Sequence, residues 1–226
     1  PLGGARRTAK TIDVPTWSDI AENYPPGVRA PLTELHQVSR PASAGKLVLW
    51  HGAPGTGKTT AIRSLMDSWA EWCEPHYIAD AERMFASTEY LLTATRSDTK
   101  ESRWKLIIAE DTDEFLRVSA RRQAGAALGR LLNFTDGIIG QGSNTIVLLT
   151  TNEQLAELHP AVTRPGRCLA QIEFTKFTPS EGAIWLGGEY AHPTEPKTLA
   201  ELLQIKGEAT HISNGIEEAQ AAGTYL

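Results

Sequence analysis

Short apolar runs alternate with segments of helical periodicity along the central part of this chain. Residues 46–50, 106–109 and 145–149 are apolar runs of strand length, residues 75–79 also read as a strand, and residues 171–174 alternate as an edge strand does. The runs end in polar residues. Because strands that alternate with helical segments form parallel sheets covered on both faces, the pattern predicts an α/β fold with a parallel sheet sandwiched by helices.

The segments between these runs have the spacing of amphipathic helices. After residue 58, apolar side chains recur at spacings of three and four, which predicts a helix to about Cys73 with one buried stripe. Residues 123–133 predict another helix. Shorter helical stretches are expected near residues 83–85 and 90–92.

The first 45 residues predict less regular structure. Residues 1–15 are polar and are expected to be a flexible lead-in. Residues 16–24 have two interpretations: a capped turn that packs on the core, or a segment that contacts a bound ligand. We interpret Pro25-Pro26-Gly27 as a stop, followed by a short helix from Pro31 to Arg40.

The chain changes character at Thr178-Pro179-Ser180-Glu181, which is a good helix cap. Short helices are predicted at residues 183–186, 198–203 and 215–222, so a small α-helical lid is expected at the C-terminal side. The predicted parts are an N-terminal lead-in at residues 1–45, an α/β domain at residues 46–178 and the helical lid at residues 179–226.

The stretch from Gly52 to Thr59 fits the phosphate-binding pattern G-x-x-x-x-G-K-[ST], and it lies between a predicted strand and a predicted helix. Its glycines let successive N–H groups point at phosphates, and the helix N-terminus favours an anion. Lys58 is expected to reach the terminal phosphates and Thr59 to ligate Mg²⁺. We therefore predict ATP and Mg²⁺ as cofactors, with the nucleotide held by Gly52, Ala53, Pro54, Gly55, Thr56, Gly57, Lys58, Thr59 and Thr60.

An acid pair follows the strand at residues 106–109. Glu110 and Asp111 stand at its carboxyl end, where ligands bind in α/β sheets. A phosphate-binding loop needs one carboxylate for the Mg²⁺ shell and one to polarise the attacking water, so both are predicted as catalytic and metal-binding residues. With Asp113 and Glu114 just beyond, the alternative is a solvated acidic turn.

Two arginines, Arg164 and Arg167, are separated by Pro165-Gly166 and cannot both lie on a regular helix. They are presented on a turn that suits an anion, or they are an ordinary surface pair.

Composition narrows the function classes. The 226 residues are 41% hydrophobic and 22% charged, which fits one large domain with a small appendage. The net charge of −5 disfavours nucleic acid as a partner. Cys73 and Cys168 are far apart without other ligands at metal spacing and are expected to be reduced thiols. Neither a membrane span nor a secretion signal is found, so a cytoplasmic location is expected. The chain begins at Pro1, which suggests trimming or processing.

These motifs together resemble an AAA+ ATPase of the classical AAA branch over roughly residues 16–178. The acidic residues that follow the strand at residues 106–109 are similar to those of the branch that includes the mitochondrial assembly protein of respiratory complex III. The matching motifs are the phosphate-binding loop, Glu110-Asp111, Leu131-Leu132-Asn133 with Asp136-Gly137, Thr150-Thr151-Asn152 and residues 160–167.

The resemblance implies roles for several residues. Glu110 and Asp111 match the Walker B pair in inverted order, so Asp111 takes the water-activating position. Asn152 matches sensor 1. Arg164 and Arg167 match the arginine-finger region, which acts on a neighbouring subunit. Asp19 and Ile20 match a segment that lines the adenine pocket.

Two departures from the family pattern concern substrate handling. Between residues 80 and 99, Met84-Phe85 and Tyr90-Leu91 occur, but the glycine of an aromatic-hydrophobic-glycine pore loop does not. Gly207-Glu208-Ala209-Thr210 matches the lid motif only loosely, and the sequence beyond Arg167 holds no arginine for sensor 2.

The resemblance implies a Mg²⁺-dependent ATPase that forms a homo-oligomeric ring and remodels an unidentified protein partner. The alternatives are a slowly hydrolysing ATP-dependent assembly switch, a DNA-handling AAA+ protein, which the acidic charge disfavours, and a small-molecule phosphotransferase. The last shares the phosphate-binding loop but leaves Asn152 and the two arginines unexplained.

Overall fold

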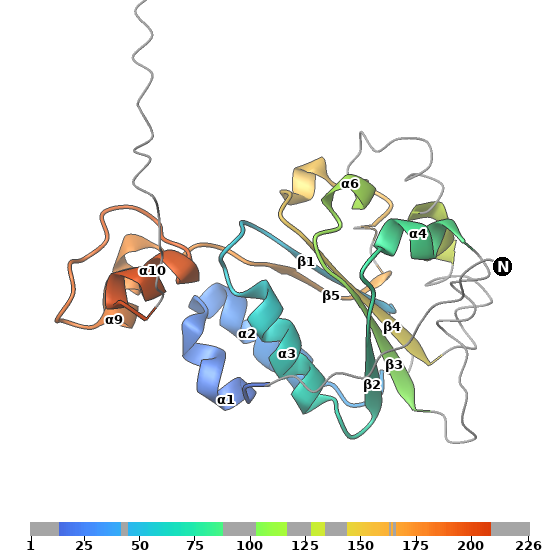
Figure 1. Cartoon of the computed structure of the whole chain (residues 1–226), viewed down its shortest axis with the longest axis horizontal. Coiled ribbons are helices and arrows are strands. Elements are labelled where there is room, and N and C mark those ends of the chain that lie inside the picture. Colours follow the sequence, from blue (N-terminus) through green and yellow to red (C-terminus); the bar gives the residue numbers. More distant parts are fainter. Residues whose placement is uncertain are drawn as a thin grey trace, which may run out of the picture.

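One parallel sheet organises the fold of the computed structural model, which describes residues 14–41, 45–87, 103–116, 128–133, 144–162, 164 and 166–208. Its strand order is β2-β3-β4-β1-β5, and all neighbours pair in parallel (Figure 1). The predicted α/β fold is therefore confirmed. The strands are β1 (Leu47–His51), β2 (Cys73–Tyr77), β3 (Trp104–Ala109), β4 (Thr145–Thr151) and β5 (Cys168–Glu173).

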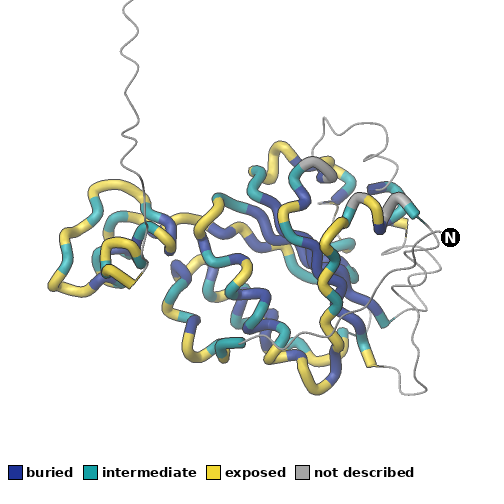
Figure 2. Tube along the Cα trace, viewed as in Figure 1, coloured by how far each residue is buried: buried dark blue, intermediate teal, exposed yellow. Residues whose placement is uncertain are grey.

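Helices cover both faces of this sheet. On one face, α2 (Pro26–His36) and α3 (Lys58–Ser68) pack on strand residues such as Val48 and Trp50. On the other, α4 (Ala81–Ala86), α6 (Asp113–Leu116) and the helical residues 128–133 lie over residues such as Leu47 and Leu49 (Figure 1). Successive side chains of a strand point to opposite faces, so apolar runs that are buried on both sides belong to central strands (Figure 2).

The segment before α2 packs on the core, as one of its two interpretations requires. It forms α1 (Trp17–Ile20) and the 3₁₀ turn η1 (Ala21–Asn23). Trp17 stacks on His36 with ring centroids 4.3 Å apart, and Ile20 is buried in the same apolar cluster as residues of α2 and α3. This packing does not test the second interpretation, a role in holding a base.

Three predicted helix boundaries are wrong. Pro25-Pro26-Gly27 ends the first segment as predicted, since η1 stops at Asn23, but it also begins helix α2, because a proline at the first helical position loses no hydrogen bond. The helix predicted from Pro31 to Arg40 therefore runs from Pro26 to His36. Pro31 then lies inside this helix. Helix α3 ends at Ser68 and not near Cys73, since Cys73 pairs with Trp104 as the first residue of β2.

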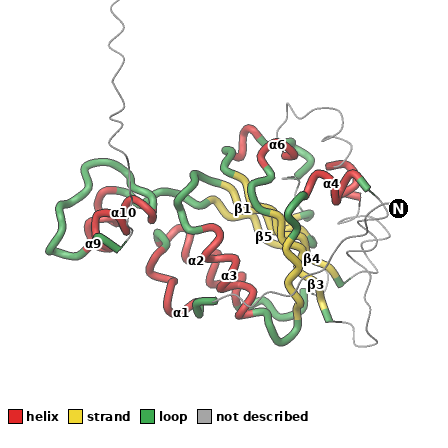
Figure 3. Tube along the Cα trace, in the orientation of Figure 1, coloured by secondary structure: helices red, strands yellow, loops and turns green. Residues whose placement is uncertain are grey.

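The C-terminal side forms a small helical lid with α9 (Pro179–Leu186) and α10 (Leu199–Lys206), which loops join to the sheet (Figure 3). Both helices begin with a capping box, at Thr178 and at Thr198. The lid has its own apolar cluster, made of Phe177, Leu186, Leu199 and Leu202. The third lid helix, predicted at residues 215–222, lies outside the described residues, and the predicted domain limits stay predictions.

Candidate functional site

The loop between β1 and α3 has the backbone geometry that the sequence pattern predicts. Gly52, Gly55 and Gly57 have φ values of 130°, 75° and 92°, in the region that favours glycine. At Gly52 a side chain is also excluded by space, because a Cβ atom would lie 2.3 Å from the carbonyl oxygen of Phe174. The loop can therefore approach an anion with its backbone.

Lys58 is the buried cation of this loop. Its Nζ donates to the carbonyl oxygens of Gly52 at 2.6 Å and Ala53 at 3.0 Å, and to Oδ1 of Asn152 at 3.0 Å. Burial lowers the pKa of Lys58, while the charges of Asp111, Asp113 and Glu110 act in the opposite direction. The ammonium thus joins the loop to Asn152, which follows β4, and lies in the field of the acids that follow β3.

The two predicted acids have different partners. Glu110 accepts a hydrogen bond from Oγ1 of Thr59 at 2.8 Å. Asp111 accepts from Nδ2 of Asn152 at 3.2 Å, and its backbone has a φ of 52°. An alcohol beside a carboxylate suits Mg²⁺, so Thr59 and Glu110 fit this ion, and Asp111 lies with the residue predicted to orient water.

This donor set also agrees with how Mg²⁺ is usually held. Within the described part of the chain, no group of three or more His, Cys, Asp or Glu side chains is placed to hold a metal ion alone. Proteins commonly bind Mg²⁺ through one or two carboxylates together with substrate phosphates. The structure brings Lys58, Thr59, Glu110, Asp111 and Asn152 together, while their roles in catalysis stay predictions.

The predicted arginine turn lies at the other end of the strands, away from the phosphate-binding loop. Arg167 accepts a backbone hydrogen bond from Leu47, the first residue of β1, whereas the phosphate-binding loop follows the last. Arg164 is exposed. The guanidinium of Arg167 donates to the carbonyl oxygen of Ala161. The two arginines are therefore not brought together with this chain's own loop; Pro165 between them lies outside the described residues.

The predicted adenine-side residues lie close to α3 but face other partners. Asp19 is exposed and accepts a hydrogen bond from Thr16 at 2.6 Å, and Ile20 is buried in the core. The link to the loop comes instead from Tyr24, whose Oη donates to the carbonyl oxygen of Gly57 at 3.1 Å. Burial raises the pKa of Tyr24. Sequence reasoning missed this residue, since a single tyrosine at the end of a mixed polar and apolar segment carries no specific signal.

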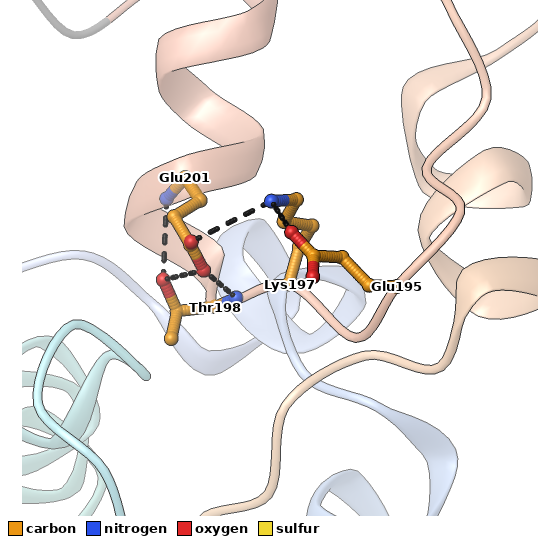
Figure 4. A network of polar contacts seen from close by, with 4 residues as sticks. All are labelled: Glu195, Lys197, Thr198 and Glu201. Carbon is orange, nitrogen blue, oxygen red and sulfur yellow. Dashed lines mark hydrogen bonds and ion pairs between the residues drawn. The ribbon is translucent and has the colours of Figure 1, made fainter. Parts of the chain in front are cut away.

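The lid meets the loop directly, which the sequence did not predict. The backbone N–H of Ala200, in the first turn of α10, donates to the carbonyl oxygen of Gly55 at 2.9 Å. Thr198 and Glu201 cap this helix, and Lys197 bonds Glu195 and Glu201 beside the cap (Figure 4). The Thr-x-x-Glu pattern marks where the helix begins but does not say what it contacts.

A cavity of about 440 Å³ lies between the lid and the N-terminal segment and is lined by residues of both. Asn23, Tyr24 and Trp185 are among the residues that line it, and Nε1 of Trp185 donates to Oδ1 of Asn23 at 3.2 Å. Tyr24 thus lies between this cavity and the phosphate-binding loop. None of the helices that the structure describes is long and apolar enough to cross a membrane.

Comparison with known proteins gives a consistent result. Residues 48–176 match the family model described as "ATPase family associated with various cellular activities (AAA)". The chain is 31% identical over 183 residues to AAA-ATPase At5g40000 of Arabidopsis thaliana, covering 70% of this chain and 37% of that protein. It is 29% identical over 192 residues to Protein CdcH of Halobacterium salinarum, covering 76% of this chain and 24% of that protein.

A third relative and a solved structure extend the comparison. The 26S proteasome regulatory subunit 6B homolog of Schizosaccharomyces pombe is 28% identical over 145 residues, covering 58% of this chain and 35% of that protein. The chain thus spans between 24% and 37% of these three relatives. A chain in the structure titled "Structure of E. coli MS115-1 HORMA:CdnC:Trip13 complex" has the same fold, with a TM-score of 0.52 and 17% identity, covering 85% of this chain and 82% of that one.

The family model covers more than half of the chain, and the loop, acids and asparagine it spans lie together at one edge of the sheet. The chain belongs to the AAA family of ATPases.

Proposed function

We propose that this protein is a Mg²⁺-dependent ATPase that acts as a homo-oligomeric ring and remodels a protein partner. One observation carries the proposal: hydrogen bonds from Lys58 to Asn152, from Asn152 to Asp111 and from Thr59 to Glu110 join the phosphate-binding loop to the acids of β3. A loop that only happened to match the pattern would not need these partners.

Each residue of this network has a task in hydrolysis. The loop backbone and Lys58 would bind the phosphates of ATP. Thr59 and Glu110 would hold Mg²⁺, which supplies positive charge against the transferring phosphoryl group. Asp111 would accept a proton from the attacking water, and Asn152 would orient that water.

We also propose that the base of the nucleotide lies on the side of the N-terminal segment. The backbone of Asp19 and Ile20 stays a candidate for this contact, because α1 packs against α3. The cavity between the segment and the lid supports this side of the molecule, since Tyr24 lines the cavity and also bonds Gly57.

The place of the arginine turn supports an oligomer. Arg164 is exposed at the end of the strands away from its own loop, so a phosphate that it contacts would belong to another copy. A relative named as a proteasome regulatory subunit and a fold neighbour solved in a complex with other proteins support action on a protein partner. The cytoplasmic location and the absence of nucleic acid stay predictions.

A second candidate, the slowly hydrolysing assembly switch, has one observation in its favour. Asp111 is one methylene shorter than the glutamate of the family pattern, and its backbone lies in the left-handed region at φ 52°. A shorter carboxylate that is bonded to Asn152 reaches less far toward a water molecule.

The Asp111→Asn variant separates the two candidates. We expect its turnover to fall by about 10²- to 10⁴-fold, because an amide cannot act as the base. Affinity for ATP should be retained, since Lys58 and the loop are unchanged. Phosphate release over a range of micromolar protein concentrations gives the turnover, and a fluorescent ATP analogue gives the affinity.

Asp67→Asn, at an exposed position of α3, is the matched control and should keep wild-type turnover. Loss of partner remodelling with retained assembly in Asp111→Asn would support the remodelling ATPase. If Asp111→Asn remodels the partner as wild type does, the assembly switch would be the better description.

A further inference from the structure

Asp113, a residue with no role in the function proposed so far, has unusually complete contacts with the end of β4. Its Oδ1 accepts hydrogen bonds from Oγ1 of Thr151 at 2.6 Å and from the backbone N–H of Asn152 at 2.8 Å. Its Oδ2 accepts from Nδ2 of Asn152 at 3.4 Å. Three donors from two consecutive residues thus converge on one carboxylate.

The side-chain amide of Asn152 can serve the site in one orientation only. Its oxygen accepts from the ammonium of Lys58 at 3.0 Å, and its nitrogen donates to Asp111 at 3.2 Å. In the flipped orientation the amide N–H groups would face the ammonium, and the oxygen would face two carboxylates. Asp113 adds the second carboxylate on the nitrogen side, so it favours the orientation that the site uses.

Asp113 is itself held in a fixed place relative to Asn152. It is the first residue of α6, and the preceding Thr112 bonds the carbonyl oxygen of Thr150 through its backbone N–H at 2.9 Å and through Oγ1 at 2.8 Å. The segment that carries both acids is therefore anchored to β4, the strand that leads into Asn152. A carboxylate anchored in this way restricts the orientation of its hydrogen-bond partner more than a carboxylate on a free loop would.

We propose that Asp113 is a positioning residue that sets the orientation of the Asn152 side chain between Lys58 and Asp111. It acts through Asn152 and does not itself touch the nucleotide or the water. This inference rests on the proposed ATPase function, because Asn152 matters for turnover only if the site hydrolyses ATP.

A double-mutant cycle tests the inference in the full chain. Asp113→Asn keeps the size of the side chain and one acceptor oxygen for Thr151 and the backbone N–H of Asn152, but it places an amide nitrogen where Oδ2 accepts from Nδ2 of Asn152. We expect kcat to fall by about tenfold to a hundredfold, as misplaced groups do, with the affinity for a fluorescent ATP analogue unchanged. Asn152→Ala should lower kcat as well, and the double variant should be no slower than Asn152→Ala alone, because one residue acts through the other.

Three results would overturn the inference: an unchanged kcat in Asp113→Asn, losses that multiply in the double variant, or a loss that lies only in ATP affinity. Glu157→Gln, an exposed change in the nearby turn η2 (Leu155–Glu157), is the control and should match wild type. If Asp113→Asn does not fold, as judged by thermal unfolding, Thr151→Val removes a donor to the same carboxylate. Thr151→Ser keeps this hydroxyl and should retain more activity than Thr151→Val.

A second readout needs no turnover. In protein labelled with ¹⁵N-asparagine, the side-chain amide resonance of Asn152 is assigned by its disappearance in Asn152→Asp, and Asp113→Asn should shift it strongly. An unmoved resonance would contradict the positioning role. Wild-type protein that binds ATP without hydrolysing it would instead contradict the proposed function, so the two failures can be told apart.

Discussion

The Lys58→Ala variant is expected to lose ATP binding and, with it, all hydrolysis. Lys58 is the buried cation between the loop and three carboxylates, Glu110, Asp111 and Asp113. Removing it takes away the expected phosphate contact and leaves the negative charge of those carboxylates unopposed. Losing one partner of a hydrogen-bonded charge pair with a phosphate costs about 2–5 kcal/mol of binding, so titration with a fluorescent ATP analogue should show little binding at concentrations that saturate wild type.

Repulsion among these carboxylates should also lower the thermal stability of the Lys58→Ala variant. Because Lys58 opposes their mutual repulsion, the variant without nucleotide should unfold at a lower temperature than wild type, and added Mg²⁺ should recover part of the loss. Lys176→Ala, at an exposed lysine, is the control and should bind ATP normally. Full ATP affinity in Lys58→Ala would mean that the loop does not bind phosphate through this residue.

The residues that the sequence placed correctly are those whose signal is local. The apolar runs became the strands, and the glycines of the phosphate-binding loop have the backbone angles that the pattern predicts. Glu110 and Asp111 were placed at a strand end because a run of apolar residues stops there. In each case the information lies within about ten neighbouring residues, where propensity and periodicity decide the structure.

The contacts that the sequence did not predict join residues far apart in the chain. Tyr24 donates a hydrogen bond to Gly57, and Ala200 donates one to Gly55. These residues are so far apart in the sequence that no hydrophobic periodicity predicts the contacts. Asp113 was visible only as one of four acids, and its partners Thr151 and Asn152 become apparent once β3 and β4 are paired. The error in the start of α2, predicted at Pro31 and found at Pro26, has a different cause: prolines disrupt helices in their interior but are favoured in the first turn.

The arginine turn shows how topology adds to a local pattern. The sequence predicts a turn between Arg164 and Arg167 but cannot say at which edge of the sheet it lies. Parallel pairing of β5 with β1 places it beside Leu47, away from the loop that follows His51. The two arginines also differ: Arg167 bonds Ala161 within the chain, whereas the guanidinium of Arg164 is exposed. Arg164 is therefore the better candidate for a contact with another copy.

Arg164→Ala is accordingly expected to lower ATP turnover by about 10³- to 10⁵-fold, the effect of removing an arginine supplied from a neighbouring subunit. ATP affinity per chain should change little, because the loop and Lys58 are intact. Steady-state phosphate release across the micromolar range measures the loss, and in wild type the rate per chain should rise with protein concentration. Arg83→Ala, at an exposed arginine of α4, is the control and should keep wild-type turnover.

Mixing two inactive variants distinguishes a contact between copies from one within a chain. Lys58→Ala keeps Arg164 but cannot bind ATP, and Arg164→Ala binds ATP but lacks the arginine. In mixed assemblies, a chain with an intact loop can sit beside a chain with an intact arginine, so turnover should exceed the sum of the two variants alone. Two results together would contradict the contact between copies: no recovery of ATP turnover in mixtures that do assemble, and a wild-type rate per chain that does not depend on protein concentration. They would mean that each chain completes its own site and that the turn at Arg164 serves another purpose.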